Sequence, residues 1–231
     1  MPRPKLVAIV MPAHNEAAAI GQVLFRIPAE IEGAKVITIV VDDGSTDGTG
    51  EIAQAHGAHV VRHLTNLGVG AATITGFRAA RALGADMIVT IDADGQHNPE
   101  EIGRLVQCLN EGPFDVVIGS RILTRHGMPL SRFTANLLLN ALTYVVYGKI
   151  VSDSQSGFKV FTRHAADALD LRSSGYEICS EIVGEIYRKK LRYKSLPIKP
   201  VYTAYSHAKG QHFLNGVNLV LGLLMRWVRR I

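Results

Sequence analysis

The sequence is poor in cysteine, with only Cys108 and Cys179 among its 231 residues. The two lie far apart, each in a stretch with helical periodicity, so the sequence predicts neither a disulfide framework nor a thiolate zinc site. This usage is typical of a reducing compartment. Long apolar runs are also lacking near the N-terminus, where the run at residues 6–11 is too short for the core of a signal peptide. We therefore expect a strand there and no export signal.

Low-complexity segments and proline-rich or serine-rich linkers are absent as well, and hydrophobic residues make up 47% of the chain. This composition is globular rather than disordered. The net charge of +5 and the pI of about 9.3 favour anionic partners. However, the basic clusters at residues 189–194 and 226–230 do not alternate basic with aromatic side chains as a nucleic-acid groove does, so nucleic acid is not a predicted partner.

Up to about residue 119, short apolar runs rich in β-branched residues alternate with stretches of helical periodicity. This alternation predicts an α/β fold with a mainly parallel, Rossmann-like sheet flanked by helices, because strands buried on both faces are continuously apolar. We expect a helix after Asn98, with Pro99 in its first turn and Glu101 as a capping-box partner. The strands are expected at residues 6–11, 36–41, 59–62, 87–91 and 116–118. Without a repeat or a linker, we expect one catalytic domain at residues 1–210, followed by an amphipathic helix at 211–231.

Acidic and polar side chains follow these strands at the point where each strand ends. Ligands of open α/β sheets bind beyond the carboxyl ends of the strands, so these side chains should meet in one crevice. Five carboxylates would gather there, and so much negative charge is costly unless cations or hydrogen-bond donors compensate it. A bound divalent metal is the natural compensation. The five are Glu16, Asp42, Asp43, Asp92 and Asp94.

The segment Asp92-Ala93-Asp94 is the strongest candidate for that metal. The oxygens of Asp94 and of the Gln96 amide suit Mg²⁺ or Mn²⁺, which take one or two carboxylates and complete their shell with phosphate oxygens and water. An isolated Asp-x-Asp is more often a turn with an aspartate cap. Its position directly after a buried strand, together with Asp42, favours the metal site.

Three motifs now carry a resemblance. The strings DDGSTD at residues 42–47, DADGQ at 92–96 and SGF at 156–158 resemble, in this order and spacing, the family 2 inverting glycosyltransferases. Within that family the chain is most similar to the dolichyl-phosphate and polyprenyl-phosphate sugar synthases, over residues 5–210. The resemblance implies a glycosyltransferase A-type fold and a UDP-sugar or GDP-sugar donor.

The resemblance also implies roles for single residues. Asp92, Asp94 and Arg121 would be the catalytic residues, with Asp94 and Gln96 binding Mg²⁺ or Mn²⁺ and Asp92 near the sugar. Arg121 matches a position at the donor or acceptor phosphates. The family's usual arginine near the last strand is not evident, because Tyr202 and Tyr205 occupy that neighbourhood. The nucleotide-sugar-binding set implied by the resemblance comprises Pro12, His14, Glu16, Asp42, Asp92, Arg132 and Lys209.

The acceptor is expected to be a polyprenyl phosphate. An alcohol acceptor needs a general base, whereas a phosphate monoester with a second pKa of ~6 is already mostly ionised at neutral pH. No family-type base motif is evident in the second half of the chain, which favours the phosphate. Two alternatives remain: the same fold with a soluble saccharide or protein hydroxyl as acceptor, and a non-catalytic nucleotide-sugar-binding module. A sugar-phosphate nucleotidyltransferase is disfavoured, because it would need a glycine-rich phosphate loop with arginine and lysine after the first strand, and residues 12–16 have neither.

Two apolar segments, at residues 133–151 and 217–228, point to a membrane surface. The first has more apolar side chains than one core-facing stripe requires, and the second is followed by arginines but is shorter than the roughly 20 residues of a membrane span. We expect peripheral association with the cytoplasmic face of a membrane, with a homodimer as a further expectation. The alternative is that both segments are core helices or an oligomer interface.

Overall fold

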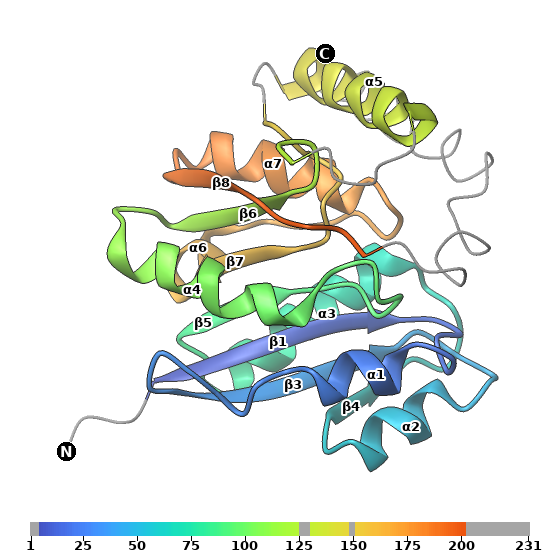
Figure 1. Ribbon diagram of the computed structural model, residues 1–231. Coiled ribbons are helices and arrows are strands. Elements are labelled where there is room, and N and C mark those ends of the chain that lie inside the picture. Colours follow the sequence, from blue (N-terminus) through green and yellow to red (C-terminus); the bar gives the residue numbers. More distant parts are fainter. Residues whose placement is uncertain (1–4, 125–129, 148–150, 202–231) are drawn as a thin grey trace.

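The computed structural model describes residues 5–124, 130–147 and 151–201. In that part of the chain an eight-stranded mixed sheet lies between two layers of helices (Figure 1). The strand order is β2-β3-β1-β5-β7-β6-β8, and β4 pairs with the carboxyl-terminal half of β3. The strands are β1 (Leu6–Ala13), β2 (Glu30–Ile31), β3 (Ala34–Asp42), β4 (His59–Arg62), β5 (Met87–Thr90), β6 (Val116–Ser120), β7 (Lys159–Thr162) and β8 (Tyr193–Pro197).

All five predicted strands are confirmed within a few residues. β4, β3, β1 and β5 run parallel to one another, and residues 7–11 of β1 are completely buried, as the continuous apolar run predicted. The sequence did not reveal β7, which pairs antiparallel with both β5 and β6, nor β8, which is parallel to β6. The sheet is therefore mainly parallel, with β7 reversed near its middle and the two-residue β2 antiparallel at its edge.

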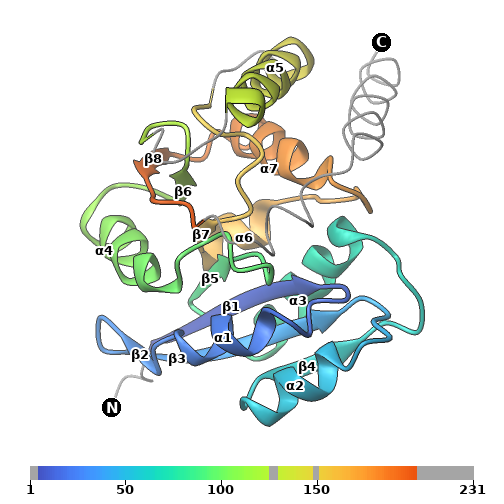
Figure 2. The ribbon, with the colours of Figure 1, turned by 45° about the vertical axis from the view of Figure 1, so that its right-hand side comes forward.

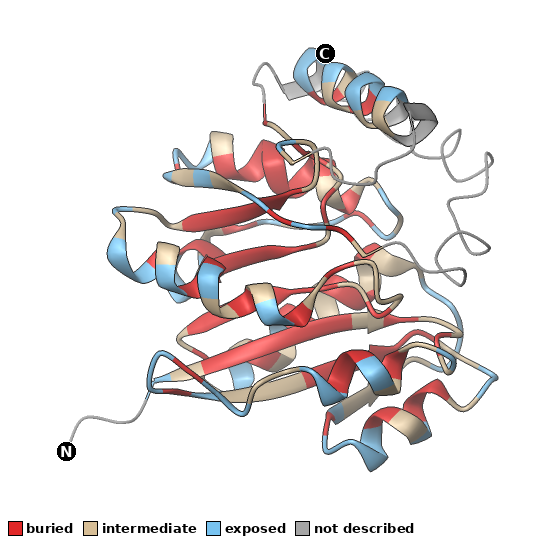
Figure 3. Cartoon of the chain, in the orientation of Figure 1, coloured by how far each residue is buried: buried red, intermediate tan, exposed pale blue. Residues whose placement is uncertain are grey.

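Helices cover both faces of the sheet (Figure 2), and the strands between them form the buried interior (Figure 3). One apolar cluster joins the sheet to α1, α2 and α4, and a second joins it to α3, α6 and α7. The bounds of these helices are α1 Ile20–Phe25, α2 Thr49–Ala55, α3 Val69–Ala82, α4 Ile102–Glu111, α6 Arg163–Ala168 and α7 Ile178–Arg188.

The predicted helix start at Asn98 is confirmed in part. The Asn98 side chain accepts a hydrogen bond from the Glu100 amide, and Pro99 opens a 3₁₀ turn, Pro99–Glu101, that leads into α4. The capping box is wrong: the Glu101 carboxylate instead accepts from Arg104 and from the Lys199 amide. This contact ties the start of α4 to the segment after β8.

Helix α5 (Leu130–Tyr147) lies apart from both layers, beside α7. It docks through hydroxyl groups, since Thr143 Oγ1 lies 3.1 Å from Ser180 Oγ of α7. In the described part of the chain no helix is both long enough and apolar enough to cross a membrane. The predicted helix at residues 211–231 lies outside the described residues.

Candidate active site

The carboxyl ends of β1, β3 and β5 lie side by side, as the parallel sheet requires. Ala13 at the end of β1 pairs with Asp42 at the end of β3, and Val10 of β1 pairs with Thr90 at the end of β5. The loops that follow these strands therefore start at one edge of the sheet. The prediction that these strand ends share one edge is confirmed, whereas the gathering of their polar side chains into one site stays a prediction.

Asp42 is completely buried and bound from two sides. The Ser45 amide donates to one carboxylate oxygen at 3.0 Å, and Arg62 Nε of β4 donates to the other at 2.9 Å. Arg62 also reaches Glu51 of α2 at 2.7 Å. A Cβ on Gly50 would overlap this Asp42–Arg62 pair, so a glycine is required beside it.

Asp43 belongs to the scaffold rather than to a cation site. Its carboxylate accepts from His63 Nδ1 at 2.6 Å, from the Leu67 amide at 2.9 Å and from the Gly68 amide at 2.8 Å. These donors compensate the charge without a metal and fasten the loop after β4 to the end of β3. The expectation that all five carboxylates crowd one crevice is therefore corrected for Asp43.

The loop after β1 is interlocked with the loop after β3. Asn15 has a positive φ of 54°; its backbone amide donates to Ser45 Oγ, and its side chain accepts from the Thr46 amide. Asp47 accepts from the Ala17 amide at 2.9 Å. The sequence analysis gave Asn15 and Asp47 no role of their own, although an asparagine in a loop is a frequent site of positive φ.

The three predicted nucleoside-side residues of the first loop lie on this interlocked pair. Pro12 is the penultimate residue of β1 and pairs with Val41. His14 Nδ1 lies 2.9 Å from the Asp43 carbonyl oxygen. The backbone of Glu16 donates to Thr49 Oγ1 at 2.8 Å, and its side chain is mostly buried.

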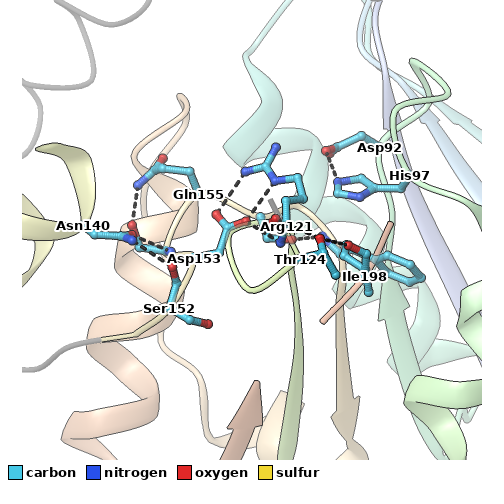
Figure 4. A network of polar contacts seen from close by, with 12 residues as sticks. Asp92, His97, Arg121, Thr124, Asn140, Ser152, Asp153, Gln155 and Ile198 are labelled. Carbon is cyan, nitrogen blue, oxygen red and sulfur yellow. Dashed lines mark hydrogen bonds and ion pairs between the residues drawn. The ribbon is translucent and has the colours of Figure 1, made fainter. Parts of the chain in front are cut away.

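Asp92 and Asp94 have different partners, although they stand two residues apart. His97 Nε2 lies 3.1 Å from Asp92 Oδ2 (Figure 4). Asp94 instead accepts from the Gln96 amide at 2.9 Å and from Gln96 Nε2 at 2.8 Å. Buried His97 thus holds Asp92, whereas sequence reasoning gave it no role beyond an ordinary loop residue.

The two carboxylates also differ in their affinity for protons. Burial raises the pKa of Asp94, and the neighbouring Asp92 raises it further. For Asp92 the effect of burial is outweighed by the hydrogen bond from His97 and by the charges of His97, Arg121 and Lys159, so its pKa lies below the usual value. Negative charge is thus compensated at Asp92 and under-compensated at Asp94.

This arrangement fits a divalent metal. In the described residues no three His, Cys, Asp or Glu side chains cluster as a metal site. Mg²⁺ and Mn²⁺ take one or two carboxylates and leave the remaining positions to water and phosphate, and Asp94 offers one such carboxylate. The raised pKa of Asp94 marks the place where a cation would relieve repulsion. Asp94 and the amide oxygen of Gln96 are the residues that would hold it.

A single loop, residues 151–157, touches both Asp92 and Arg121. A Cβ on Gly157 would lie 2.6 Å from Asp92 Cγ, so the SGF motif needs a glycine there for steric reasons. Thr90 Oγ1 donates to the Gly157 carbonyl oxygen at 2.7 Å, and the amine of buried Lys159 donates to that of Ser156. The sequence predicted the motif but neither of these two supports.

Arg121 forms a bidentate ion pair with Asp153 of the same loop. Arg121 Nε and Nη2 donate to the two carboxylate oxygens at 2.9 and 3.0 Å. Asp153 is completely buried, and although burial alone would raise its pKa, the charge and hydrogen bonds of Arg121 keep that pKa below the usual value. Two further basic residues were predicted to bind the phosphates, Arg132 and Lys209. Arg132 lies in α5, but its side chain is outside the described part of the structure, and Lys209 lies outside the described residues altogether.

The Asp153–Arg121 pair should make stability dependent on pH. A carboxylate whose pKa is lower in the folded than in the unfolded state stabilises above the unfolded value, near 3.8, and loses that contribution as the pH falls through the folded value. Asp153→Asn should therefore cost roughly 3 kcal/mol at pH 7, as breaking a buried pair does, and progressively less below about pH 4. Urea unfolding of both proteins at pH 7, 5, 4 and 3 measures this, and an equal difference at every pH would contradict it.

The comparisons with known proteins agree with this geometry. A sequence model of the family described as glycosyl transferase family 2 matches residues 8–170. The chain is 36% identical over 243 residues to a UDP-N-acetylglucosamine–dolichyl-phosphate N-acetylglucosaminyltransferase of Methanococcus voltae, covering 96% of each protein. It is 30% identical over 236 residues to an undecaprenyl-phosphate mannosyltransferase of Micrococcus luteus, again covering 96% of each.

The fold is also similar to solved structures. Glucosyl-3-phosphoglycerate synthase from Mycobacterium tuberculosis, in complex with Mn²⁺, UDP-glucose and glycerol 3-phosphate, superposes with a TM-score of 0.68 at 25% identity, covering 96% of this chain and 80% of that one. The predicted A-type α/β fold is confirmed by this likeness. Because the family model matches more than half of the chain, and two full-length relatives reach 30% identity or more, this chain belongs to glycosyl transferase family 2.

Proposed function

We propose that this chain transfers a hexosyl group from a nucleoside diphosphate sugar to a polyprenyl phosphate, with inversion at the sugar carbon. The observation that carries the proposal is the Asp92–Gln96 loop at the end of β5, where His97 contacts Asp92, Gly157 leaves room for the Asp92 carboxylate, and Asp94 remains under-compensated. The sugar-transferring names of the full-length relatives support it.

The donor side is proposed to be formed by the loops after β1 and β3. The interlocked segment around His14 and Glu16 offers hydrogen-bonding groups for a nucleoside. Asp42, which is fully buried and paired with Arg62, would support this segment by accepting from the Ser45 amide. We favour uridine over guanosine, because UDP stands in the names of the Methanococcus voltae relative and of the mycobacterial complex. A bound Mg²⁺ or Mn²⁺ would neutralise charge on the departing diphosphate.

The acceptor side is proposed to be formed around Arg121. Its guanidinium group is already oriented by Asp153, and its charge acts on both Asp92 and Asp94, so it lies close to the donor carboxylates. An ionised phosphate needs positioning and charge compensation more than proton removal, and a fixed arginine supplies both.

A membrane surface would present such an acceptor, and α5 carries a matching face. Its exposed side chains recur at residues 134, 137, 138, 141, 144 and 145, which is one stripe of a helix. The large apolar members are Leu137, Leu138, Tyr144 and Val145, at 56%, 68%, 48% and 64% exposure. We propose that this stripe contacts lipid; the cytoplasmic face, the homodimer and the division at residue 210 remain predictions.

Asp94→Ala should abolish metal-dependent transfer while leaving the fold intact, because it removes the proposed metal ligand and no buried support of the scaffold. The assay pairs UDP-sugars and GDP-sugars with a short-chain polyprenyl phosphate, a soluble saccharide and no acceptor, each with Mn²⁺, Mg²⁺ or chelator. We expect a loss of at least about 10³-fold with unchanged thermal unfolding. Full activity in the variant would refute the metal assignment, and transfer by the wild type only to the saccharide would refute the phosphate acceptor.

Gly157→Ala should lower kcat by about 100-fold or more, because the added methyl group would displace the Asp92 carboxylate and misplace the reacting groups. Gly103→Ala is the matched control, since a Cβ there meets nothing within 4 Å. Initial rates and thermal unfolding of both variants test this. Equal rates in the two variants would show that Asp92 tolerates the displacement.

Replacing Leu138 and Val145 of α5 together by Gln should weaken binding to vesicles several-fold, because two apolar side chains leave the proposed lipid contact. Leu64→Gln is the control, a fully exposed leucine far from α5 in the sequence. Co-sedimentation with anionic vesicles and light scattering measure the outcome. Unchanged sedimentation would contradict the lipid contact, and conversion of a dimer to a monomer would assign the stripe to a subunit interface.

A further inference from the structure

The loop at residues 151–157 is also held by helix α5. Asn140 of α5 donates from Nδ2 to the Ser152 carbonyl oxygen and accepts at Oδ1 from the Ser154 amide, both at 2.9 Å. Figure 4 shows this contact next to the Asp153–Arg121 pair. The two hydrogen bonds grip the peptide groups on either side of Asp153.

This grip fixes the direction in which the Asp153 side chain leaves the backbone. Both partners of Asn140 are main-chain groups. Its amide nitrogen donates to a carbonyl oxygen and its amide oxygen accepts from a backbone N–H, so both ends of the side-chain amide are satisfied. The contact spans 12 and 14 residues of sequence, so it depends on where α5 lies and not on local chain geometry.

Asp153 passes this constraint on to Arg121. It accepts from the Arg121 backbone amide at 3.1 Å as well as from Nε and Nη2. Three hydrogen bonds to one carboxylate fix both the backbone position and the plane of the guanidinium group, because the bidentate pairing is geometrically demanding. In this connection from Asn140 to Asp153 to Arg121, the central Asp153 is completely buried, whereas Asn140 and Arg121 are half-buried.

We propose that Asn140 is a positioning residue that orients Arg121 through Asp153, so that helix α5 sets the geometry of the acceptor-phosphate site. The importance of Arg121 for the acceptor rests on the function proposed above, whereas the mechanical connection does not. The same helix carries the exposed apolar stripe, so a contact made by that stripe acts on a helix that is fastened to Arg121.

A second anchor of α5 provides the control. Thr143 Oγ1 contacts Ser180 Oγ at 3.1 Å and Ser154 Oγ at 3.3 Å, and it touches neither peptide group that Asn140 grips. Thr143→Val therefore removes one anchor of α5 but none of the hydrogen bonds that join Asn140 to Asp153 and Arg121. A role of Asn140 in docking alone predicts equal effects for Asn140→Ala and Thr143→Val.

The connection is tested first without any reaction, by ¹H–¹⁵N spectra of the arginine Nε–H groups in the full chain. The Arg121 signal is assigned by its loss in Arg121→Lys. We expect it to be retained in Thr143→Val, but shifted or lost through solvent exchange in Asn140→Ala and in Asp153→Asn. An unchanged Arg121 signal in Asn140→Ala overturns the proposal. Should that variant fail to fold, Asn140→Asp, which keeps only the bond from the Ser154 amide, gives the same test.

The consequence for the reaction is tested by a double-mutant cycle with a short-chain polyprenyl phosphate as acceptor. Asn140→Ala should lower kcat/KM for the acceptor at least tenfold while the donor KM stays unchanged. In an Arg121→Lys background the same substitution should lower kcat/KM less than threefold, because the guanidinium group that the connection positions is then absent. Equal losses in the two backgrounds overturn the proposal. A wild type that transfers nothing to the phosphate refutes the proposed function, and the arginine spectra then decide the connection alone.

Discussion

The compensation of negative charge at one edge of the sheet is the constraint on which the rest of the structure depends. A parallel sheet brings the ends of β1, β3 and β5 together, and the sequence places acids at the ends of β3 and β5. Carboxylates that are buried, as Asp42 and Asp43 are, or that stand close together, as Asp92 and Asp94 do, are costly unless they are paired or hydrogen bonded. Each carboxylate here has a different set of ion-pair and hydrogen-bond partners, and these contacts hold much of the loop structure around the edge.

The four aspartates differ in how far the protein compensates their negative charge. Arg62 pairs with Asp42, and His63 with two backbone amides satisfies Asp43. His97 contacts Asp92, and the charges of Arg121 and Lys159 add to its effect. Asp94 accepts hydrogen bonds from the Gln96 amide and side chain, and burial together with the neighbouring Asp92 raises its pKa. The charge that the protein does not compensate for itself is thus concentrated at the position proposed for the metal.

The sequence predicted the features that follow from periodicity and from strand ends. The apolar runs of β1, β3 and β5 are long and continuous, so both their positions and the gathering of Asp42 and Asp92 at one edge could be derived. β7 could not, because Lys159 and Thr162 at its two ends interrupt the apolar character expected of a buried strand. Its antiparallel place between β5 and β6 depends on the sheet that surrounds it.

The same distinction applies to the site. Asp94, Gln96 and Arg121 stand in motifs, and the sequence could name them. His97 acts on a partner 5 residues away and Asp153 on one 32 residues away. Asn140 has two partners, 12 and 14 residues away. Nothing in the local sequence of these three residues identifies the partners. Asp43 was counted among the carboxylates of the crevice because a row of acids after a strand does not reveal which of them will face backbone amides.

The loop at residues 151–157 explains why the two sides of the reaction need not be positioned separately. Gly157 lies against Asp92. Asp153, which stands four residues before Gly157 in the same loop, holds Arg121. Four residues span at most about 14 Å, and the loop is also clamped by Thr90, Lys159 and Asn140. An in-line transfer requires the reacting atoms within about 3–3.5 Å of each other. One short, multiply fastened segment that touches both Asp92 and Arg121 limits the distance between the proposed donor and acceptor sides. A shift of α5 would therefore act on Arg121 through Asn140, while Thr90 and Lys159 hold the segment beside Asp92 in place.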